Sequence, residues 1–213
     1  MAQSVKTIAI DVVSDVICPW CFLGKRRLDK AIGLLDDVKV DVNWRPFFLD
    51  PAIPKAGMSR KDYMEAKFGA ERLKTIHDPL IAAGKEDGVP YNFDKITRTP
   101  NTLDAHRLIR WSHPSGKQSD VAERLFMAYW NGGLDVGDPG VLVKIAGDAG
   151  LDAAAIAQKL EDGSDADAVT AEVGQAARMG VNGVPCFILG RKQGLMGAQP
   201  PDALADAIRA LAS

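Results

Sequence analysis

Two cysteines lie three positions apart near the start of the chain, in the run Cys18-Pro19-Trp20-Cys21. A thiolate is the nucleophile in disulfide exchange, and the N-terminus of a helix favours that charge because its backbone N–H groups are free. If a helix begins at Cys18, we expect Cys18 to be the exposed, activated thiol. Cys21 then lies one turn later, where it can attack a mixed disulfide formed at Cys18. The pattern predicts thiol–disulfide exchange with Cys18 and Cys21 as catalytic residues.

The same cysteine pair also fits half of a zinc site, or two cysteines in a hydrophobic core. A zinc site needs a second ligand pair at short spacing. The remaining candidate ligands are scattered along the chain: His77, His106, His113 and Cys186. We therefore expect no metal site. We expect Cys186 to be a small buried side chain, as free cysteines often are, with a third redox thiol as the alternative.

A second motif, Gly183-Val184-Pro185, opens the apolar run at residues 186–189. A proline removes a donor from a β-ladder, so it is expected at the start of a strand, where it is compatible with a cis peptide bond. We predict that the Val184–Pro185 bond is cis and faces Cys18, leaving the Val184 backbone free to pair with an extended substrate. A simple boundary between loop and strand is the alternative.

Further substrate contacts are predicted around the cysteine pair. Pro19 and Trp20 lie between the cysteines, and we expect Trp20 to be partly exposed. His106 is expected near the pair, where it would bind substrate or tune the thiolate; a structural histidine is the alternative. The charged run Lys25-Arg26-Arg27 is expected to be solvated.

Hydrophobic periodicity predicts the elements that position these residues. Alternation over residues 6–13 and 38–44 predicts two strands. Between them, Leu28, Ala31, Ile32 and Leu35 form an apolar stripe on a helix that has Pro19 in its first turn. The chain thus opens β-α-β, with the cysteine pair where the first strand leads into the helix.

The rest of the chain is predicted to be mostly helical. Three prolines favour an extended loop over residues 45–55. We expect helices at 59–85, 101–112, 119–131, 139–149, 152–160, 165–179 and 201–211, and short strands at 184–189 and 195–197. This order predicts an α/β thioredoxin-like fold with a helical insertion. Residues 1–57 and 161–213 would form the thioredoxin-like domain, and residues 58–160 the inserted helical domain.

Composition narrows the function classes. The chain has 213 residues, of which 46% are hydrophobic, enough for a sizeable core. A formal net charge of −2 gives no electrostatic case for binding nucleic acid or an acidic membrane surface. The first residues lack the long apolar segment of a secretory signal, and three cysteines do not suit a disulfide framework. We therefore expect a cytoplasmic location.

The motifs together resemble the DsbA-like oxidoreductases, in particular the FrnE subgroup. The resemblance rests on CPWCFLG at residues 18–24, WRPF at 44–47, NTLDAHR at 101–107, GVNGVP at 180–185 and GAQP at 197–200. It implies a DsbA-like protein disulfide oxidoreductase with Cys18 as nucleophile, Cys21 as resolving thiol, Pro185 in cis and Val184 offering its backbone to substrate. The partners implied are protein thiols and disulfides or small thiols, for a monomer or a homodimer.

A related branch, the kappa-class glutathione transferases and 2-hydroxychromene-2-carboxylate isomerases, is similar at residues 44–47 and at the Val-Pro loop. Members of that branch carry a serine where Cys18 stands, and their glutathione-holding Ser-Asp pair falls near Ala198-Gln199, where it is absent. The alternative function is therefore a glutathione-dependent transferase or isomerase that uses the Cys18 thiolate alone. We expect no tightly bound cofactor, with glutathione as a candidate co-substrate. A non-enzymatic binding module is disfavoured because it needs no activated thiol pair.

Overall fold

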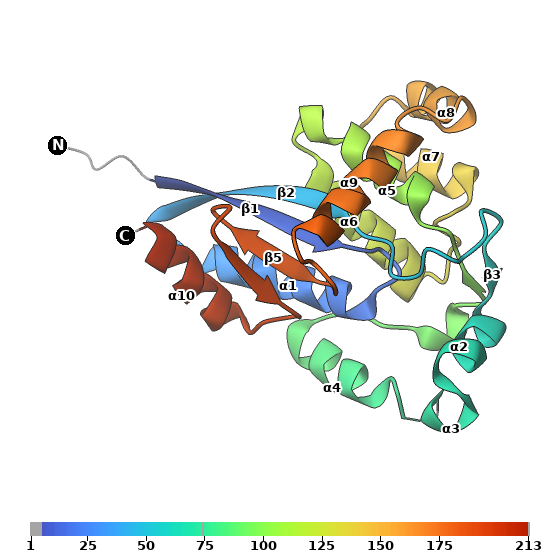
Figure 1. Cartoon of the computed structure of the whole chain (residues 1–213), viewed down its shortest axis with the longest axis horizontal. Helices are drawn as coiled ribbons and strands as arrows, with labels where there is room; N and C mark the ends of the chain where they lie inside the picture. Colours follow the sequence, from blue (N-terminus) through green and yellow to red (C-terminus); the bar gives the residue numbers. More distant parts are fainter. Residues whose placement is uncertain (1–5, 74, 213) are drawn as a thin grey trace.

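A four-stranded mixed sheet forms the centre of the computed structural model, which describes residues 6–73 and 75–212. The strands are β1 (Lys6–Ser14), β2 (Val38–Pro46), β5 (Cys186–Leu189) and β6 (Gln193–Met196), in the order β2-β1-β5-β6. β1 is parallel to β2 and antiparallel to β5, and β6 is antiparallel to β5 (Figure 1). The alternation that predicted β1 is confirmed, because Ile8, Ile10 and Val12 are all buried.

The register of the sheet brings the two sequence motifs together. Val13 of β1 pairs with Cys186, the first residue of β5. The Val184–Pro185 segment that leads into β5 therefore lies beside the end of β1, immediately before the cysteine run. Two motifs more than 160 residues apart thus meet at one end of the sheet.

Ten α-helices surround the sheet within the described residues. They are α1 (Pro19–Gly33), α2 (Arg60–Phe68), α3 (Ala70–Leu73), α4 (Asp78–Asp87), α5 (Leu103–Trp111), α6 (Gln118–Phe126), α7 (Pro139–Asp148), α8 (Ala153–Glu161), α9 (Ala166–Arg178) and α10 (Pro201–Ala212). Short additional elements are β3 (Met58–Ser59) paired with β4 (Arg98–Thr99), 3-10 turns at Phe93–Lys95 and His113–Ser115, and a π-helical turn at Met127–Asn131.

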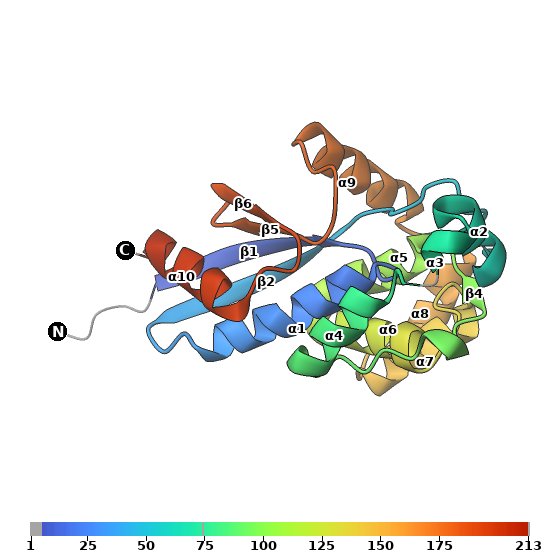
Figure 2. The same cartoon turned by 90° about the horizontal axis from the view of Figure 1, so that it is seen from below.

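The helices form layers around the sheet. α1 and α10 pack together on one face, where Ile10, Phe187 and Leu189 are fully buried. α9 lies on the other face (Figure 2) and covers a small separate cluster that includes Val13 and Cys186. Helices α2 to α8 gather at the end of the sheet where α1 begins (Figures 1 and 2). The cysteine run and the proline loop therefore lie where the sheet meets the helical block.

The predicted helix at 59–85 is wrong, because the described residues of that segment form three helices. α2 ends before Gly69, which has a φ of 74°, a left-handed conformation that a helix interior does not allow. Pro79 lies in the first turn of α4, where its missing N–H leaves no hydrogen bond unmade. The helix predicted to end at residue 131 does continue to that point, but its last turn is π-helical.

The expectation that residues 25–27 are solvated is also wrong. Lys25 is buried and lies 3.0 Å from Glu123 of α6, while Arg27 forms an ion pair of 2.7 Å with Asp87 at the end of α4. The polar side of α1 is covered by α4 and α6, so Lys25 and Arg27 are largely enclosed against carboxylates of those helices. These ion pairs tie α1 to the helical block.

The sheet and the helical block share one hydrophobic core, which extends from Ile10 of β1 to Leu142 of α7. The division into a thioredoxin-like domain and an inserted domain at residues 58 and 160 stays a prediction, and its residues 1–5 lie outside the described residues. No helix in the part of the chain that the structure describes is long and apolar enough to cross a membrane.

Candidate active site

Cys18 is the N-cap residue of α1, with Pro19 in the first turn, as the sequence predicts. Its backbone is extended, with φ −91° and ψ 113°, and its N–H donates to the carbonyl oxygen of Asp15 at 3.0 Å. The Cys21 N–H donates to the carbonyl oxygen of Cys18 at 3.0 Å and closes the first turn. The thiol of Cys18 therefore stands at the positive end of the helix dipole, with Cys21 one turn further on.

The cysteine pair faces the proline loop. The Val184–Pro185 peptide bond is cis, which confirms the prediction, and Cys18 Sγ lies 3.7 Å from the Val184 carbonyl oxygen. The expectation of an exposed Cys18 is wrong, because the residue is 3% exposed, enclosed on this side by the proline loop. Trp20, between the cysteines, is 40% exposed, as predicted. Pro19, Trp20, Val184 and Pro185 thus surround Cys18, whereas their contact with substrate stays a prediction.

Close packing holds the proline loop against α1. The Pro185 carbonyl oxygen accepts a hydrogen bond of 2.7 Å from the N–H of Gly197, which follows β6. Gly24 of α1 lies directly beneath the loop, and a Cβ there would be 2.9 Å from Pro185 Cγ and 3.2 Å from Phe187 Cζ. The absence of a side chain at position 24 allows the helix that carries the cysteines to touch the loop.

Cys21 is the buried member of the pair, at 1% exposed. Burial raises the pKa of the Cys21 thiol well above its usual value, and the hydrogen bond and charge of Cys18 raise it further. Interactions with the Asp15 backbone and the Ser14 side chain act in the opposite direction on that pKa. Cys21 therefore keeps its proton at neutral pH and lies in contact with Cys18.

Two aromatic residues of the helical block support the redox turn, and sequence reasoning missed both. The Tyr91 hydroxyl donates to the Pro19 carbonyl oxygen at 2.6 Å, and burial together with the charges of the two cysteines raises the pKa of Tyr91. Trp130, in the π-helical turn, donates from Nε1 to the Val16 carbonyl oxygen at 2.9 Å. No local pattern marks either residue, because each acts through a contact distant in sequence.

His106 lies behind the redox turn, at 4% exposed. Its Nε2 is 3.0 Å from the Phe47 carbonyl oxygen and 3.4 Å from Oδ1 of Asp15. Asp15 is itself 0% exposed and accepts the Leu49 N–H through Oδ2 at 2.7 Å. His106 is therefore enclosed, and whether it contacts substrate stays a prediction. Asp15 was missed, although a charged residue inside the apolar run 12–17 is itself a signal of a buried polar function.

Cys186 is buried on the α9 side of the sheet, with Val13, Ala176 and Val181, as expected for a small core side chain. Burial raises the pKa of its thiol. Among the described residues, no group of three or more His, Cys, Asp or Glu side chains is placed to hold a metal ion. The arrangement is thus two adjacent thiols at a helix N-terminus, opposite a cis-proline loop.

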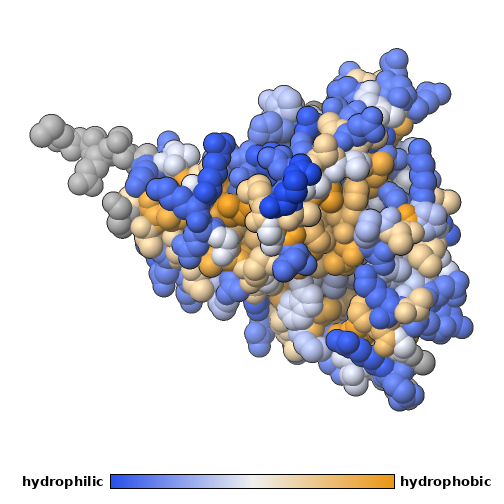
Figure 3. Space-filling view, in the orientation of Figure 1, coloured by the Kyte–Doolittle hydropathy of each residue, from blue (hydrophilic) through white to orange (hydrophobic). Residues whose placement is uncertain are grey.

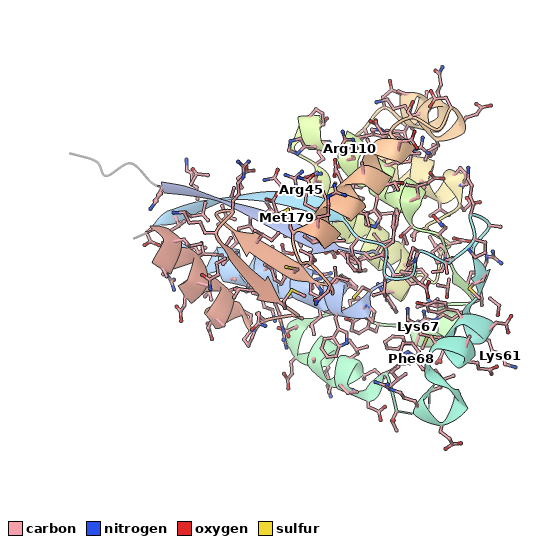
Figure 4. All side chains as sticks on the ribbon, in the orientation of Figure 1. Arg45, Lys61, Lys67, Phe68, Arg110 and Met179 are labelled. Atoms are coloured by element: carbon pink, nitrogen blue, oxygen red, sulfur yellow. The ribbon has the colours of Figure 1, made fainter. Side chains whose placement is uncertain are left out.

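The molecular surface around this site is apolar. Figure 3 shows apolar side chains gathered where the sheet meets the helical block. The exposed side chains Met179 and Met196 flank the proline loop in sequence, and Figure 4 shows Met179 at the end of α9, across this face from Lys67 and Phe68 of α2. A surface of this kind is suited to apolar parts of a substrate.

Comparison with known proteins assigns the family. The chain matches the family described as DSBA-like thioredoxin domain over residues 9–209. A probable DsbA oxidoreductase from Streptomyces coelicolor is 31% identical with a TM-score of 0.87, covering 95% of this chain and 89% of that chain. The uncharacterized protein YwbO of Bacillus subtilis (strain 168) is 29% identical over 189 residues, covering 86% of this chain and 88% of that protein.

More distant structures share the fold. A 2-hydroxychromene-2-carboxylate isomerase has a TM-score of 0.75 at 18% identity, covering 96% of each chain. The cytosolic disulfide reductase DsbM from Pseudomonas aeruginosa, solved with GSH, has a TM-score of 0.67 at 20% identity, covering 96% of this chain and all of that one. The match over residues 9–209 covers nearly the whole chain. The chain belongs to the DsbA-like thioredoxin domain family.

Proposed function

We propose that the protein is a protein disulfide oxidoreductase that works through a Cys18–Cys21 dithiol–disulfide couple. The observation that supports this most directly is the placement of both cysteines in the first turn of α1, with Cys18 Sγ 3.7 Å from the Val184 carbonyl oxygen. The Cys18 thiolate attacks a substrate disulfide, and one substrate sulfur leaves as a thiolate. Cys21 then attacks Cys18 Sγ, forms the intramolecular disulfide and releases the second substrate sulfur. The reverse sequence oxidises a substrate dithiol.

The substrates we propose are protein thiols and disulfides or small thiols. Pro19, Trp20, Val184 and Pro185 would contact them, and the apolar surface around the loop supports binding of a polypeptide. Glutathione is the co-substrate we propose. It would act as reductant or oxidant according to the reduction potential of the glutathione pool relative to that of the Cys18–Cys21 couple. Within the family we place the chain in the FrnE subgroup, and in the cell in the cytoplasm, where a free dithiol is maintained.

A glutathione-dependent transferase or isomerase that uses Cys18 alone is the competing function, and the role of Cys21 separates the two. The test is reduction of insulin disulfides with glutathione as the reductant. We expect Cys18→Ser to abolish the reaction and Cys21→Ser to trap the substrate as a mixed disulfide on Cys18. Cys186→Ala, which also removes a buried thiol, is the matched control and should keep the wild-type rate. Full activity of Cys21→Ser would contradict the dithiol mechanism.

A further inference from the structure

Tyr91, in the segment that follows α4, reaches the redox turn from the helical block. Its hydroxyl donates to the Pro19 carbonyl oxygen at 2.6 Å, across 72 positions of the sequence. That carbonyl belongs to the peptide group between Pro19 and Trp20, in the first turn of α1. A hydrogen bond from the helical block therefore ends on a peptide group immediately beyond the nucleophile, Cys18.

Packing fixes the direction of the Tyr91 hydroxyl. The Tyr91 ring stacks on Phe93 with centroids 5.2 Å apart, and meets Phe22 of α1 edge to face at 5.9 Å. Gly84 of α4 leaves room for the ring, because a Cβ there would be 2.8 Å from Cδ2 and Cε2 of Tyr91. A ring packed so closely is held in one rotamer. The hydroxyl is thus positioned toward the redox turn before any substrate binds.

The other end of the same peptide group is the N–H of Trp20. The first N–H groups of a helix have no partner within it, and an N-cap side chain typically accepts from the second or third of them. Cys18 is the N-cap, Pro19 has no N–H, and the Cys21 N–H donates to the Cys18 carbonyl oxygen at 3.0 Å. The Trp20 N–H is therefore the donor that the first turn offers to the Cys18 side chain.

The protonation state of Cys18 decides which partner its sulfur needs. Its side chain makes no cap hydrogen bond here, and Sγ lies 3.7 Å from the Val184 carbonyl oxygen. That oxygen can accept from the thiol S–H, but it has nothing to donate to a thiolate, which can only accept. Loss of the proton thus replaces the need for an acceptor by the need for a donor, and the Trp20 N–H can meet it.

We propose that Tyr91 is a positioning residue that stabilises the Cys18 thiolate by polarising the peptide group between Pro19 and Trp20. This rests on the proposed function, in which that thiolate is the nucleophile. Hydrogen bonds in a chain polarise one another, so a carbonyl that accepts from Tyr91 makes the N–H of the same peptide group a stronger donor. The helical block then acts on the thiolate without touching it.

Tyr91 acts as a hydrogen-bond donor at neutral pH. Burial raises the pKa of Tyr91 above its usual value, and the charges of Cys18 and Cys21 raise it further. The charge of Arg27 acts in the opposite direction on that pKa, and Arg27 is itself paired with Asp87 at 2.7 Å. The phenol therefore keeps its hydrogen in the pH range where a reactive thiolate forms, and that hydrogen stays in the bond to the redox turn.

The test follows the ultraviolet absorbance of the thiolate as the pH is raised. The absorbance of the reduced protein minus that of its disulfide form removes the contribution of the tyrosines, so below the alkaline range the difference reports the Cys18 thiolate. All proteins carry Cys186→Ala, so that the redox pair supplies the thiols. Equilibration with glutathione gives a second readout, because each disulfide formed in the protein reduces one glutathione disulfide to two thiols.

Tyr91→Phe removes the hydroxyl and keeps the ring that packs on Phe93 and Phe22. Tyr129→Phe is the matched control. It also removes a buried hydroxyl that donates to a backbone carbonyl, that of Arg98 at 3.2 Å, outside the redox turn. Urea denaturation of both variants shows whether the loss of one hydrogen bond has the same effect on the fold.

We expect the titration of Tyr91→Phe to move to higher pH, so that its thiolate fraction below the midpoint falls roughly threefold to tenfold, the equivalent of one hydrogen bond. The disulfide should be favoured at a given glutathione ratio, because the reduced form has lost its stabilisation. Tyr129→Phe should match the wild type in both readouts, whereas urea should show a similar loss of stability in the two variants.

A titration of Tyr91→Phe that coincides with that of the wild type would overturn the role of Tyr91. An equal displacement in Tyr91→Phe and Tyr129→Phe would also overturn it, since that is the mark of a general change in the helical block. A wild-type protein that never forms the disulfide between Cys18 and Cys21 would instead contradict the proposed function.

Discussion

At the scale of single residues, Cys18 and Cys21 have different environments although both are nearly enclosed. Cys18 caps α1 and lies at the positive end of its dipole. Burial and the neighbouring Cys18 raise the pKa of Cys21. A raised pKa means that Cys21 stays mainly a neutral thiol at neutral pH, and that its thiolate fraction grows as the pH climbs toward the raised value. The two cysteines should therefore differ in reactivity.

We predict that iodoacetamide modifies Cys18 before Cys21 in the reduced protein at neutral pH, and that modification of Cys21 increases steeply only in alkaline solution. Digestion with chymotrypsin cleaves after Trp20 and places the two cysteines in different peptides, so mass spectrometry gives each rate. The Cys18→Ser protein is the control for direct reaction of Cys21. Faster modification of Cys21 than of Cys18 at neutral pH would reverse their assigned roles.

The sequence predicts some of these residues and misses others for a physical reason. Cys18, Cys21, Trp20 and Pro185 lie in short motifs whose chemistry depends on local spacing. Tyr91 and Trp130 act through single hydrogen bonds to the backbone of a segment more than 70 residues away. Spacing carries no information about such contacts. The burial of Cys18 was likewise missed, because it depends on how the proline loop packs.

At the scale of elements, the contact between α1 and the proline loop positions the site. The missing side chain of Gly24 allows the helix and the loop to touch. At Gly33, near the end of the same helix, an added Cβ would meet nothing within 4 Å. We expect Gly24→Ala to lower the free energy of unfolding by about 1–3 kcal/mol, because the added methyl overlaps Pro185 and Phe187. It should also slow disulfide exchange by displacing the loop. Gly33→Ala is the matched control and should be neutral or stabilising by about 0.5–1 kcal/mol. Urea denaturation measures the free energy of unfolding of both variants. Equal stability of the two would contradict the account, because it would mean that the proline loop shifts to make room for the added methyl group at no cost.

The elements around the site differ in how far their sequences determine them. β1 and α1 follow from strict alternation and from a proline in the first turn, and both are confirmed. The segment 59–85 has helical composition throughout, yet Gly69 adopts a left-handed backbone and divides it. Helix propensity is weak beside such tertiary and backbone constraints. The pairing of β5 with β1, which creates the site, joins segments far apart in the sequence, and no local pattern specifies it.

At the scale of the whole molecule, the two ends of the chain form the sheet and the segment between them forms the wall of the site. Residues 6–46 contribute the cysteines and residues 186–196 extend the proline loop into β5 and β6. The helical block contributes Tyr91, Trp130 and His106 against the redox turn. The family assignment explains why the chain has this common thioredoxin-type arrangement.

The measurement that tests the central claim most directly is disulfide mapping after equilibration with mixtures of reduced and oxidised glutathione. Trypsin releases Cys18 and Cys21 together in the peptide of residues 7–25, and Cys186 in the peptide of residues 179–191. We predict an intramolecular disulfide confined to the first peptide, whose fraction follows the glutathione ratio reversibly, with Cys186 remaining a free thiol. A disulfide that joins the two peptides, or glutathione attached to Cys18 with Cys21 always free, would contradict the account.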